Sequence, residues 1–418
     1  MVPHRRTLRI AWLGGGPAES GGAPGVVTEL LGGLAELGHQ IDCFLPGTPR
    51  SIPEHLAQQP NLEFVSGTSK WRWNRWYSRT KITSFASGLI ARAVGNVRLR
   101  REIIERHEQR PYDLVFQNQT IESLGVPARI ARSVPIVIRP DTHQAGELRW
   151  LIAERRIAFS CQPRRVFFLV AAIMALRSLA QAVQIRRASL LICISSVFRD
   201  HIVRDYRFPV ERTVVIANPV RLDRFTRSER AIGHPPIVLV PTRLSLRKGL
   251  EDVVEIAGAL PRRGLDARVR VVGGPSMWSD YSKLLERLPS ESGEYGGRLR
   301  PHEMPGELQR SDVVLVTSKY EPFGLTVAEA LASGVPVVAS SEVGAIEHVE
   351  RDVASVVTPG DVSGFVDAIA EQLERLTNAP AKVHARARSE AERLFSTSLI
   401  CEQVSDALEQ LVEQRSRS

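Results

Sequence analysis

Residues 318–336 read Ser-Lys-Tyr-Glu-Pro-Phe-Gly-Leu-Thr-Val-Ala-Glu-Ala-Leu-Ala-Ser-Gly-Val-Pro. Two carboxylates, Glu321 and Glu329, stand on either side of a Pro-Phe-Gly turn. Pro322 favours an extended conformation for the residue before it, so the first carboxylate is expected in a loop. Residues 325–332 are good helix formers, and a glycine and a proline end them. The stretch therefore predicts a loop followed by a short helix and then a buried strand.

The start of this helix is suited to binding an anion. The first backbone N–H groups of a helix lack partners within it, and the helix dipole places positive charge at the same end. We expect the amides of Phe323, Gly324 and Leu325 to face a phosphate. Glu329 lies about one turn further along and reaches the same ligand. Amides for a phosphate and two carboxylates for hydroxyls together fit a sugar nucleotide.

The stretch resembles the Glu-x7-Glu motif of retaining glycosyltransferases with the two-domain GT-B architecture, specifically the large family 4. The spacing from Glu321 to Glu329 matches, as do the internal Phe-Gly-Leu and the trailing Glu-Ala-Leu-Ala-Ser-Gly-Val-Pro-Val-Val-Ala. Residues 241–249 read Pro-Thr-Arg-Leu-Ser-Leu-Arg-Lys-Gly and are similar to the second signature of the family. Thr242 stands where the family usually has glycine. The resemblance covers essentially the whole chain.

The resemblance implies an α/β fold: GT-B, with two doubly wound Rossmann-like domains that face a cleft and a C-terminal helix that crosses back to the first domain. We expect an acceptor-binding domain at 1–217, a nucleotide-sugar donor-binding domain at 218–397 and the returning helix at 398–418. Strand-like and helix-like runs alternate along the chain, which is the pattern of parallel α/β layers. An interdomain hinge is expected at 218–236, a Pro-containing, charged stretch.

We expect strands at 8–13, 40–44, 114–117, 136–138, 190–194, 213–216, 237–240, 269–272, 313–316 and 335–339. We expect helices at 26–37, 250–260, 281–288, 325–332, 362–377 and 398–413. The glycine-rich loop at 14–25 lacks the Gly-x-Gly-x-x-Gly spacing, so no dinucleotide site is indicated.

On the donor side, the resemblance implies that Arg243 and Lys248 hold the diphosphate and neutralise it as it leaves. Glu321 would contact hydroxyls of the donor sugar and Glu329 the ribose. Backbone contacts to the nucleotide are expected from Phe323, Gly324, Leu325, Gly273, Gly274, Arg298 and Leu299. A solvated basic loop and a simple glycine turn remain the alternatives for these segments. No Asp-x-Asp motif or histidine cluster indicates a metal, so we expect the nucleotide sugar as cosubstrate and no cofactor.

On the acceptor side, Asp141 and His143 follow the strand at 136–138, where related enzymes often carry a histidine. Either side chain could approach the reacting hydroxyl, or Asp141 caps a turn and His143 lies at the surface. By analogy, Gly21 and Gly22 would line the acceptor cleft. The resemblance implies retention of configuration, with the acceptor hydroxyl attacking from the face of the leaving group and a departing phosphate oxygen helping to remove its proton.

The net charge of +9 is unevenly distributed. Residues 1–217 hold 30 Lys and Arg and 17 Asp and Glu, a net charge of +13, whereas residues 218–418 carry −4. Such asymmetry indicates an anionic partner for the first half. Two basic segments, Lys70–Lys81 and Arg155–Arg177, combine cations with aromatic or apolar residues, as membrane-surface segments do. A buried aromatic cluster and a core helix are the alternatives, and no nucleic acid is expected.

The longest uncharged apolar run, 166–176, is shorter than the roughly 20 residues of a spanning helix, so we do not expect an integral membrane protein. Four cysteines far apart in sequence, Cys43, Cys161, Cys193 and Cys401, indicate reduced thiols in a cytoplasmic protein. A peripheral position on the inner face of the plasma membrane remains open.

The sequence therefore predicts a retaining, metal-independent hexosyltransferase that uses a UDP- or GDP-sugar. Its acceptor hydroxyl would belong to a lipid-linked or cell-envelope glycan or to a small molecule. Two alternatives remain: an enzyme with a soluble acceptor, similar to sucrose-phosphate or glycogen synthase, and a sugar-nucleotide-binding partner without catalysis.

Overall fold

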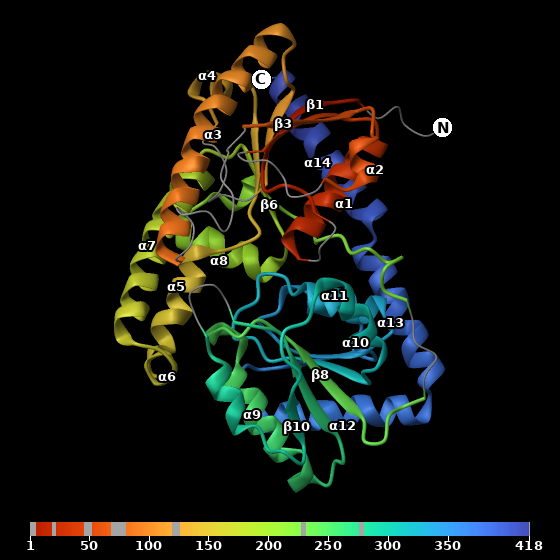
Figure 1. Cartoon of the computed structure of the whole chain (residues 1–418). Coiled ribbons are helices and arrows are strands. Elements are labelled where there is room, and N and C mark those ends of the chain that lie inside the picture. The colour runs from red at the N-terminus through yellow and green to blue at the C-terminus, as the bar shows by residue number, and fades with distance from the viewer. Residues whose placement is uncertain are drawn as a thin grey trace.

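The computed structural model describes residues 6–18, 22–45, 52–67, 81–118, 126–226, 231–275 and 280–417. Two α/β halves lie one above the other in Figure 1, each built on a parallel sheet with helices packed around it. The predicted α/β fold with two doubly wound halves is confirmed. The expected domain boundaries stay predictions. Gly21 and residues 70–80 lie outside the described part of the chain.

The first half contains a seven-stranded sheet in the order β3-β2-β1-β4-β5-β6-β7. Its strands are β1 Arg9–Gly14, β2 Gln40–Leu45, β3 Leu62–Ser66, β4 Leu114–Asn118, β5 Ile136–Arg139, β6 Leu190–Cys193 and β7 Thr213–Val215. Its helices are α1 Ala23–Glu36, α2 Glu54–Ala57, α3 Lys81–Gln109, α4 Ala128–Ser133, α5 Gln144–Ala153, α6 Arg155–Cys161, α7 Arg164–Ile185 and α8 Ser196–Tyr206. Ile10 of β1 aligns with Ile41 on one side and Leu114 on the other. The strand order reverses at β1, so ligands are expected at its carboxyl end.

The second half contains a six-stranded parallel sheet in the order β10-β9-β8-β11-β12-β13. Its strands are β8 Ile237–Pro241, β9 Arg268–Val272, β10 Gly293–Tyr295, β11 Val313–Val316, β12 Val337–Ser340 and β13 Ala354–Val357. Its helices are α9 Leu250–Ala259, α10 Met304–Gln309, α11 Leu325–Ala332, α12 Val362–Asn378, α13 Pro380–Phe395 and α14 Thr397–Arg417. Residues 281–288, expected as an α-helix, form a short 3-10 helix at Ser282–Arg287. Leu288 is extended because it precedes a proline, which ends the turn.

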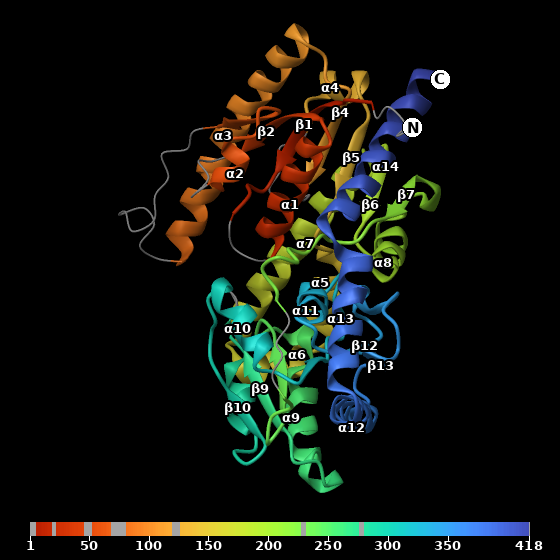
Figure 2. The same cartoon turned by 90° about the vertical axis from the view of Figure 1, so that its right-hand side faces the viewer.

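The last helix, α14, returns to the first half, as predicted, and Figure 2 shows it running along that half beside α1. A Cβ atom on Gly33 of α1 would lie 2.4 Å from Cys401 Sγ, so this glycine permits the close approach. Thr397 Oγ1 donates a hydrogen bond of 2.8 Å to Glu29, and the buried Ser405 Oγ lies 2.8 Å from His39 Nε2.

Within the described residues one helix, α7, is long and apolar enough by length and composition to cross a membrane. Only 17% of its apolar segment is buried inside the protein. The expectation that this apolar stretch is too short to span a membrane was wrong, whereas the expectation that the protein is not integral to a membrane stays a prediction. A single charge, Arg177, interrupts the apolar run, and the helix continues to Ile185.

Candidate active site

The stretch at 318–336 lies where the two halves meet. β11 ends at Val316, a loop carries Glu321, and α11 begins after Gly324, whose φ is +92°. A Cβ atom on Gly324 would lie 2.7 Å from Val343 Cγ1, so the turn requires glycine. The Glu321 N–H donates a hydrogen bond of 3.0 Å to the carbonyl of Glu342, which fixes the loop against the neighbouring segment. The predicted loop and short helix are confirmed.

One carboxylate oxygen of Glu321 accepts hydrogen bonds from two cationic side chains. Lys248 Nζ donates to its Oε2, and Arg247 donates to the same oxygen at 2.9 Å. Glu321 is 9% exposed. Burial alone would raise the pKa of Glu321, but Lys248 and Arg247 outweigh it and hold that pKa at about 2. Burial lowers the pKa of Lys248, and Glu321 opposes this shift. The carboxylate is therefore ionised at neutral pH and lies between two cations.

Lys248 is placed by a short 3-10 turn, Leu246–Lys248, that leads into α9. Gly249 follows with φ of +62°, and a Cβ atom there would lie 2.5 Å from the carbonyl oxygen of Thr317. The sequence placed Lys248 correctly just before a helix start, where the helix dipole disfavours a cation. Arg243, earlier in the same loop, is exposed, and the described residues give it no ion pair.

Sequence reasoning missed Arg247 and Glu147. Arg247 donates 2.9 Å hydrogen bonds to the carbonyl of Tyr320 and to Glu321, and forms an ion pair of 2.8 Å with Glu147 of α5. It thereby joins the first half of the chain to the catalytic candidate in the second. Its position inside the Arg-Lys-Gly signature was a usable signal. Nothing in the sequence around Glu147 indicated the pair.

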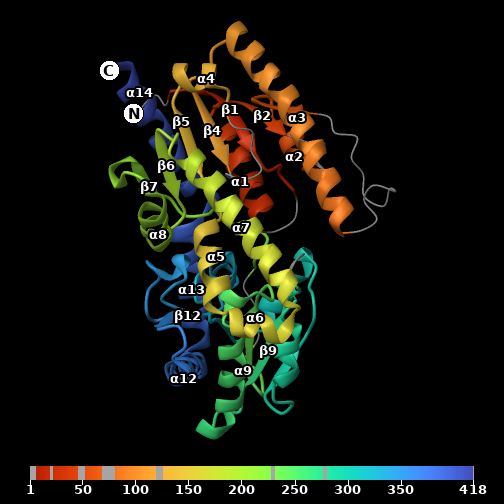
Figure 3. The same cartoon turned by 90° about the vertical axis from the view of Figure 1, so that its left-hand side faces the viewer.

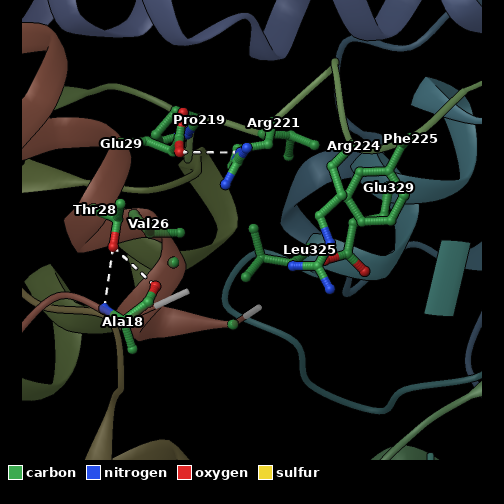
Figure 4. A pocket seen from close by; sticks show the side chains of 13 residues that line it. Ala18, Val26, Thr28, Glu29, Pro219, Arg221, Arg224, Phe225, Leu325 and Glu329 are labelled. Carbon is green, nitrogen blue, oxygen red and sulfur yellow. Dashed lines mark hydrogen bonds and ion pairs between the residues drawn. The ribbon is translucent and has the colours of Figure 1, made fainter. Parts of the chain in front are cut away.

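Glu329, the second carboxylate of the motif, lies on α11 and is half-buried. Burial raises the pKa of Glu329 to about 7, and Arg224 opposes this shift. Figure 4 shows Glu329 of α11 lying next to Arg224, which belongs to the segment that joins the two halves. The two motif carboxylates therefore differ in protonation near neutral pH.

A pocket with about 430 Å³ of space, partly open to solvent, lies beside Glu329 between the two halves (Figure 4). Its walls come from the loop before α1 and the first turns of α1, from residues 219–225 of the segment that joins the two halves, and from α11. The lining residues are Ala18, Gly22, Gly25, Val26, Thr28, Glu29, Pro219, Val220, Arg221, Arg224, Phe225, Leu325 and Glu329. Gly22 is among the lining residues, whereas Lys248 and Glu321 are not, and the role of Gly22 in an acceptor cleft stays a prediction.

His143 is fully buried, so the surface alternative for it is wrong. Its Nδ1 lies 2.9 Å from the hydroxyl of Tyr320, and its Nε2 lies 3.2 Å from Asp205 Oδ2. Burial lowers the pKa of His143, and Asp205 opposes this shift. His143 thus contacts the residue next to Glu321, and its role in catalysis stays a prediction. Asp141 is half-buried and contributes negative charge near the buried Arg139.

The remaining predicted backbone contacts cluster at the ends of β8 and β9. Gly273 has φ of +136°, and a Cβ atom on it would lie 1.7 Å from the Thr242 carbonyl oxygen. A Cβ atom on Gly274 would lie 3.1 Å from the side chain of Arg298, which is itself exposed. Leu299, by contrast, packs partly buried against the core.

Phe323 is buried, and its ring packs on Phe395 at 5.7 Å between centroids. Its carbonyl oxygen accepts a 2.7 Å hydrogen bond from the Ala345 N–H. The Phe323 side chain therefore supports the turn from inside the core, and any contact to a ligand would come from backbone atoms.

Further contacts join the two halves around this site. Lys319 forms an ion pair of 2.9 Å with Glu154, which lies between α5 and α6 in the first half. Lys319 also pairs with Glu251 of α9 in its own half. Ser195 Oγ donates a 2.7 Å hydrogen bond to the carbonyl of Pro322. The amides of Ser196 and Val197, which begin α8, donate to Glu347 at 3.0 and 2.7 Å. Among the described residues, no group of three or more His, Cys, Asp or Glu side chains is placed to hold a metal ion.

Comparison with known proteins gives two adjoining family matches. The model "Glycosyltransferase Family 4" matches residues 20–224, and "Glycosyl transferases group 1" matches residues 223–391. The glycogen synthase of Mycobacterium tuberculosis is 29% identical over 218 residues, 51% of this chain and 51% of that protein. The chain thus spans about half the length of this relative. The MMP alpha-(1->4)-mannosyltransferase of Mycolicibacterium hassiacum is 25% identical over 95% of this chain and 96% of that protein.

Solved structures share the fold over nearly the full chain. Sucrose-phosphate synthase from Thermosynechococcus elongatus superposes with a TM-score of 0.69 at 20% identity, covering 98% of this chain and 100% of that one. HepE from Anabaena, solved in complex with UDP and glucose, gives a TM-score of 0.62 at 20% identity, covering 96% and 100%.

Proposed function

Because the chain belongs to family 4 of the glycosyltransferases and has the GT-B fold, we propose that it moves a hexose from a UDP- or GDP-sugar to an acceptor hydroxyl with retention of configuration. The observation that carries this proposal is the cluster of Glu321 with Lys248 and Arg247, whose side chains are at most 18% exposed, beside the start of α11.

The cations of the site match the charge that the reaction develops. Cleavage of the bond between sugar and nucleotide leaves negative charge on the diphosphate, and preorganised cations stabilise that charge best in a site shielded from water. We assign this role to Lys248 and Arg243, aided by the first amides of α11. Arg247 is already bound to two carboxylates and a carbonyl, so we assign it to holding Glu321 in place. With these cations in the site, we propose that transfer requires no metal ion.

The two carboxylates suit different parts of the donor. Glu321 is ionised, so it accepts hydrogen bonds from sugar hydroxyls and faces the positive charge that develops on the sugar ring. Glu329, with a pKa of about 7, exists in both forms near neutral pH, and a ribose hydroxyl can either donate to it or accept from it. The pocket beside Glu329, lined by α11 and by residues 219–225 of the segment that joins the two halves, supports this assignment of the ribose.

We propose that the acceptor is a lipid-linked or cell-envelope glycan at the cytoplasmic face of the membrane. The net charge of +13 on residues 1–217, the half that would bind the acceptor, supports an anionic surface nearby. A soluble acceptor remains the second candidate, since the relatives include enzymes named glycogen synthase and sucrose-phosphate synthase.

A thermal-shift comparison with UDP-, GDP- and ADP-sugars tests the donor site. We expect one nucleotide class to raise the unfolding temperature of the wild-type chain, and Lys248→Ala to lose this shift. Lys283→Ala, an exposed lysine of the same half, is the matched control and should keep it. If no nucleotide sugar stabilises the wild-type chain, or if both lysine variants behave alike, the assignment of Lys248 to the diphosphate is wrong.

A further inference from the structure

Helix α7 is apolar on the face that points away from the protein. Its most exposed large side chains are Phe168 at 61%, Leu169 at 51%, Leu176 at 70%, Leu179 at 67% and Val183 at 53%. At 3.6 residues per turn these positions fall within about 100° around the helix axis, so they lie on one side of it. From the first to the last, this outer stripe extends about 22 Å. A soluble surface rarely exposes so long a continuous apolar stripe unless another surface covers it.

The opposite face fixes α7 to the first half of the chain. Phe167, Val170 and Ile185 are buried. The fully buried Gln181 donates a 2.7 Å hydrogen bond to the Thr142 carbonyl and accepts one of 2.6 Å from the Tyr206 hydroxyl. These contacts hold α7 along the domain surface, so in this fold it cannot also cross a bilayer. The helix lies at the left edge of Figure 1 and faces the viewer in Figure 3.

Between Glu154 and Asp200, every side chain that is charged at neutral pH is an arginine. Residues 155–199 contain eight arginines and no aspartate or glutamate. Arg164 and Arg165 precede the outer stripe, Arg186 and Arg187 follow it, and all four are exposed. Arginine side chains next to an apolar surface bury their methylene groups and keep the guanidinium in the headgroup layer of a membrane. An apolar stripe with cations at both ends therefore complements an anionic lipid surface.

A second copy of the chain fits this surface poorly. Two α7 helices packed stripe to stripe would bring arginine pairs together at both ends, whether the helices run parallel or antiparallel. Like charges brought together oppose association. A bilayer with anionic headgroups instead presents opposite charge to these arginines. This attraction is stronger at low salt, because dissolved ions screen exposed charges.

We propose that the outer stripe of α7 (Phe168, Leu169, Leu176, Leu179 and Val183) inserts into the surface of an anionic membrane while the arginine pairs at its two ends bind lipid phosphates. Ile152, on the neighbouring helix α5 that packs against α7, is a further exposed apolar side chain, at 47%. The docked helix lies parallel to the bilayer. Gln162, which follows α6, donates a 3.1 Å hydrogen bond to the Tyr281 hydroxyl, so the start of α7 stays close to the second half. The contact would keep both halves of the enzyme near the lipid surface, whichever sugar is transferred.

Co-sedimentation of the full chain with vesicles tests this proposal. We expect binding to vesicles of phosphatidylglycerol and phosphatidylcholine, weaker binding to phosphatidylcholine alone, and loss of affinity as salt is raised. The double variant Leu176→Glu/Leu179→Glu should bind the anionic vesicles at least tenfold more weakly. Val210→Glu is the matched control, because this valine is 54% exposed but lies outside α7, and it should bind as the wild type does.

A second variant, Arg164→Gln/Arg165→Gln, keeps the apolar stripe and removes one arginine pair. It should lose the preference for anionic vesicles, and its circular dichroism should remain that of the wild type. The proposal is overturned if the wild-type chain binds no vesicles at low salt, or if the α7 variants and Val210→Glu bind equally. It is also overturned if light scattering shows a wild-type dimer that Leu176→Glu/Leu179→Glu converts to a monomer, since a second copy would then cover the stripe.

Discussion

Replacing Glu321 by glutamine should destabilise the protein by about 3 kcal/mol, and the loss should depend on pH. Lys248, whose side chain is only 15% exposed, loses the one carboxylate that it pairs with among the described residues, whereas Arg247 keeps its ion pair with Glu147. Breaking a buried ion pair by removing one partner costs about 3–5 kcal/mol, and the remaining pair of Arg247 puts this case at the lower end. The pKa of Glu321 leads to a destabilisation of the same size, because its fall from 4.5 to about 2 on folding corresponds to roughly 3 kcal/mol.

The pH dependence follows from the direction of that shift. The pKa of Glu321 is lower in the folded chain than its ordinary value, so its contribution is present above about pH 4.5 and is lost as the pH falls toward 2. Urea unfolding followed by circular dichroism should therefore give a constant gap between wild type and Glu321→Gln from pH 7 to pH 5. The gap should shrink below pH 4.5.

The matched control is Glu371→Gln, an exposed glutamate on α12 that pairs with Arg375 one turn away. Such a surface pair contributes less than about 1 kcal/mol. The reasoning is refuted if Glu321→Gln and Glu371→Gln cost the same, or if the Glu321→Gln gap stays unchanged in acid. A nucleotide that stabilises Glu321→Gln more than the wild type would agree with an anion taking the place of the lost carboxylate beside Lys248.

Three further outcomes follow from the site. Because burial raises the pKa of Glu329, the wild-type chain should lose stability relative to Glu329→Gln as the pH rises from 4.5 through about 7, measured by urea unfolding at each pH; parallel curves would contradict this. Arg247→Gln should lower kcat at least tenfold in a donor-hydrolysis assay because it frees Glu321, whereas Arg262→Gln, at an exposed arginine, should not; equal activities would remove Arg247 from the site. Gly146→Ala places a Cβ atom 2.7 Å from the Tyr320 ring, so it should loosen the contact between the two halves and raise KM for the donor; an unchanged KM would show that this contact does not affect donor binding.

Much of the second half could be predicted because its signals are local. The stretch from Tyr320 to Ala339 carries its own turn, helix and strand signals, and the sequence located Lys248 at a helix start. The strands that were missed, β3, β10 and β13, lie at sheet edges or are short. Gly293–Tyr295 has only three residues, too few for a periodic pattern. Helix α13 was missed because arginine and alanine dominate it, which leaves few apolar positions to count.

The contacts that complete the site could not be read from the sequence because they join distant segments. Glu147 meets Arg247 only when α5 packs on the second half, and nothing near either residue indicates the partner. His143 is buried because Tyr320 and Asp205 close over it from two other segments. The outer stripe of α7 was underestimated for a different reason, since one arginine in the middle of the run was taken as its end.

Release of nucleoside diphosphate by the purified full chain tests the central claim most directly. The wild-type chain should release UDP or GDP from one sugar nucleotide, faster when a suitable acceptor is present. Glu321→Gln should release it at least a hundredfold more slowly while still binding the nucleotide, since the cations of the site remain. If the wild-type chain releases no nucleoside diphosphate from any sugar nucleotide, or if Glu321→Gln is as active as the wild type, the proposed transfer at this site is wrong.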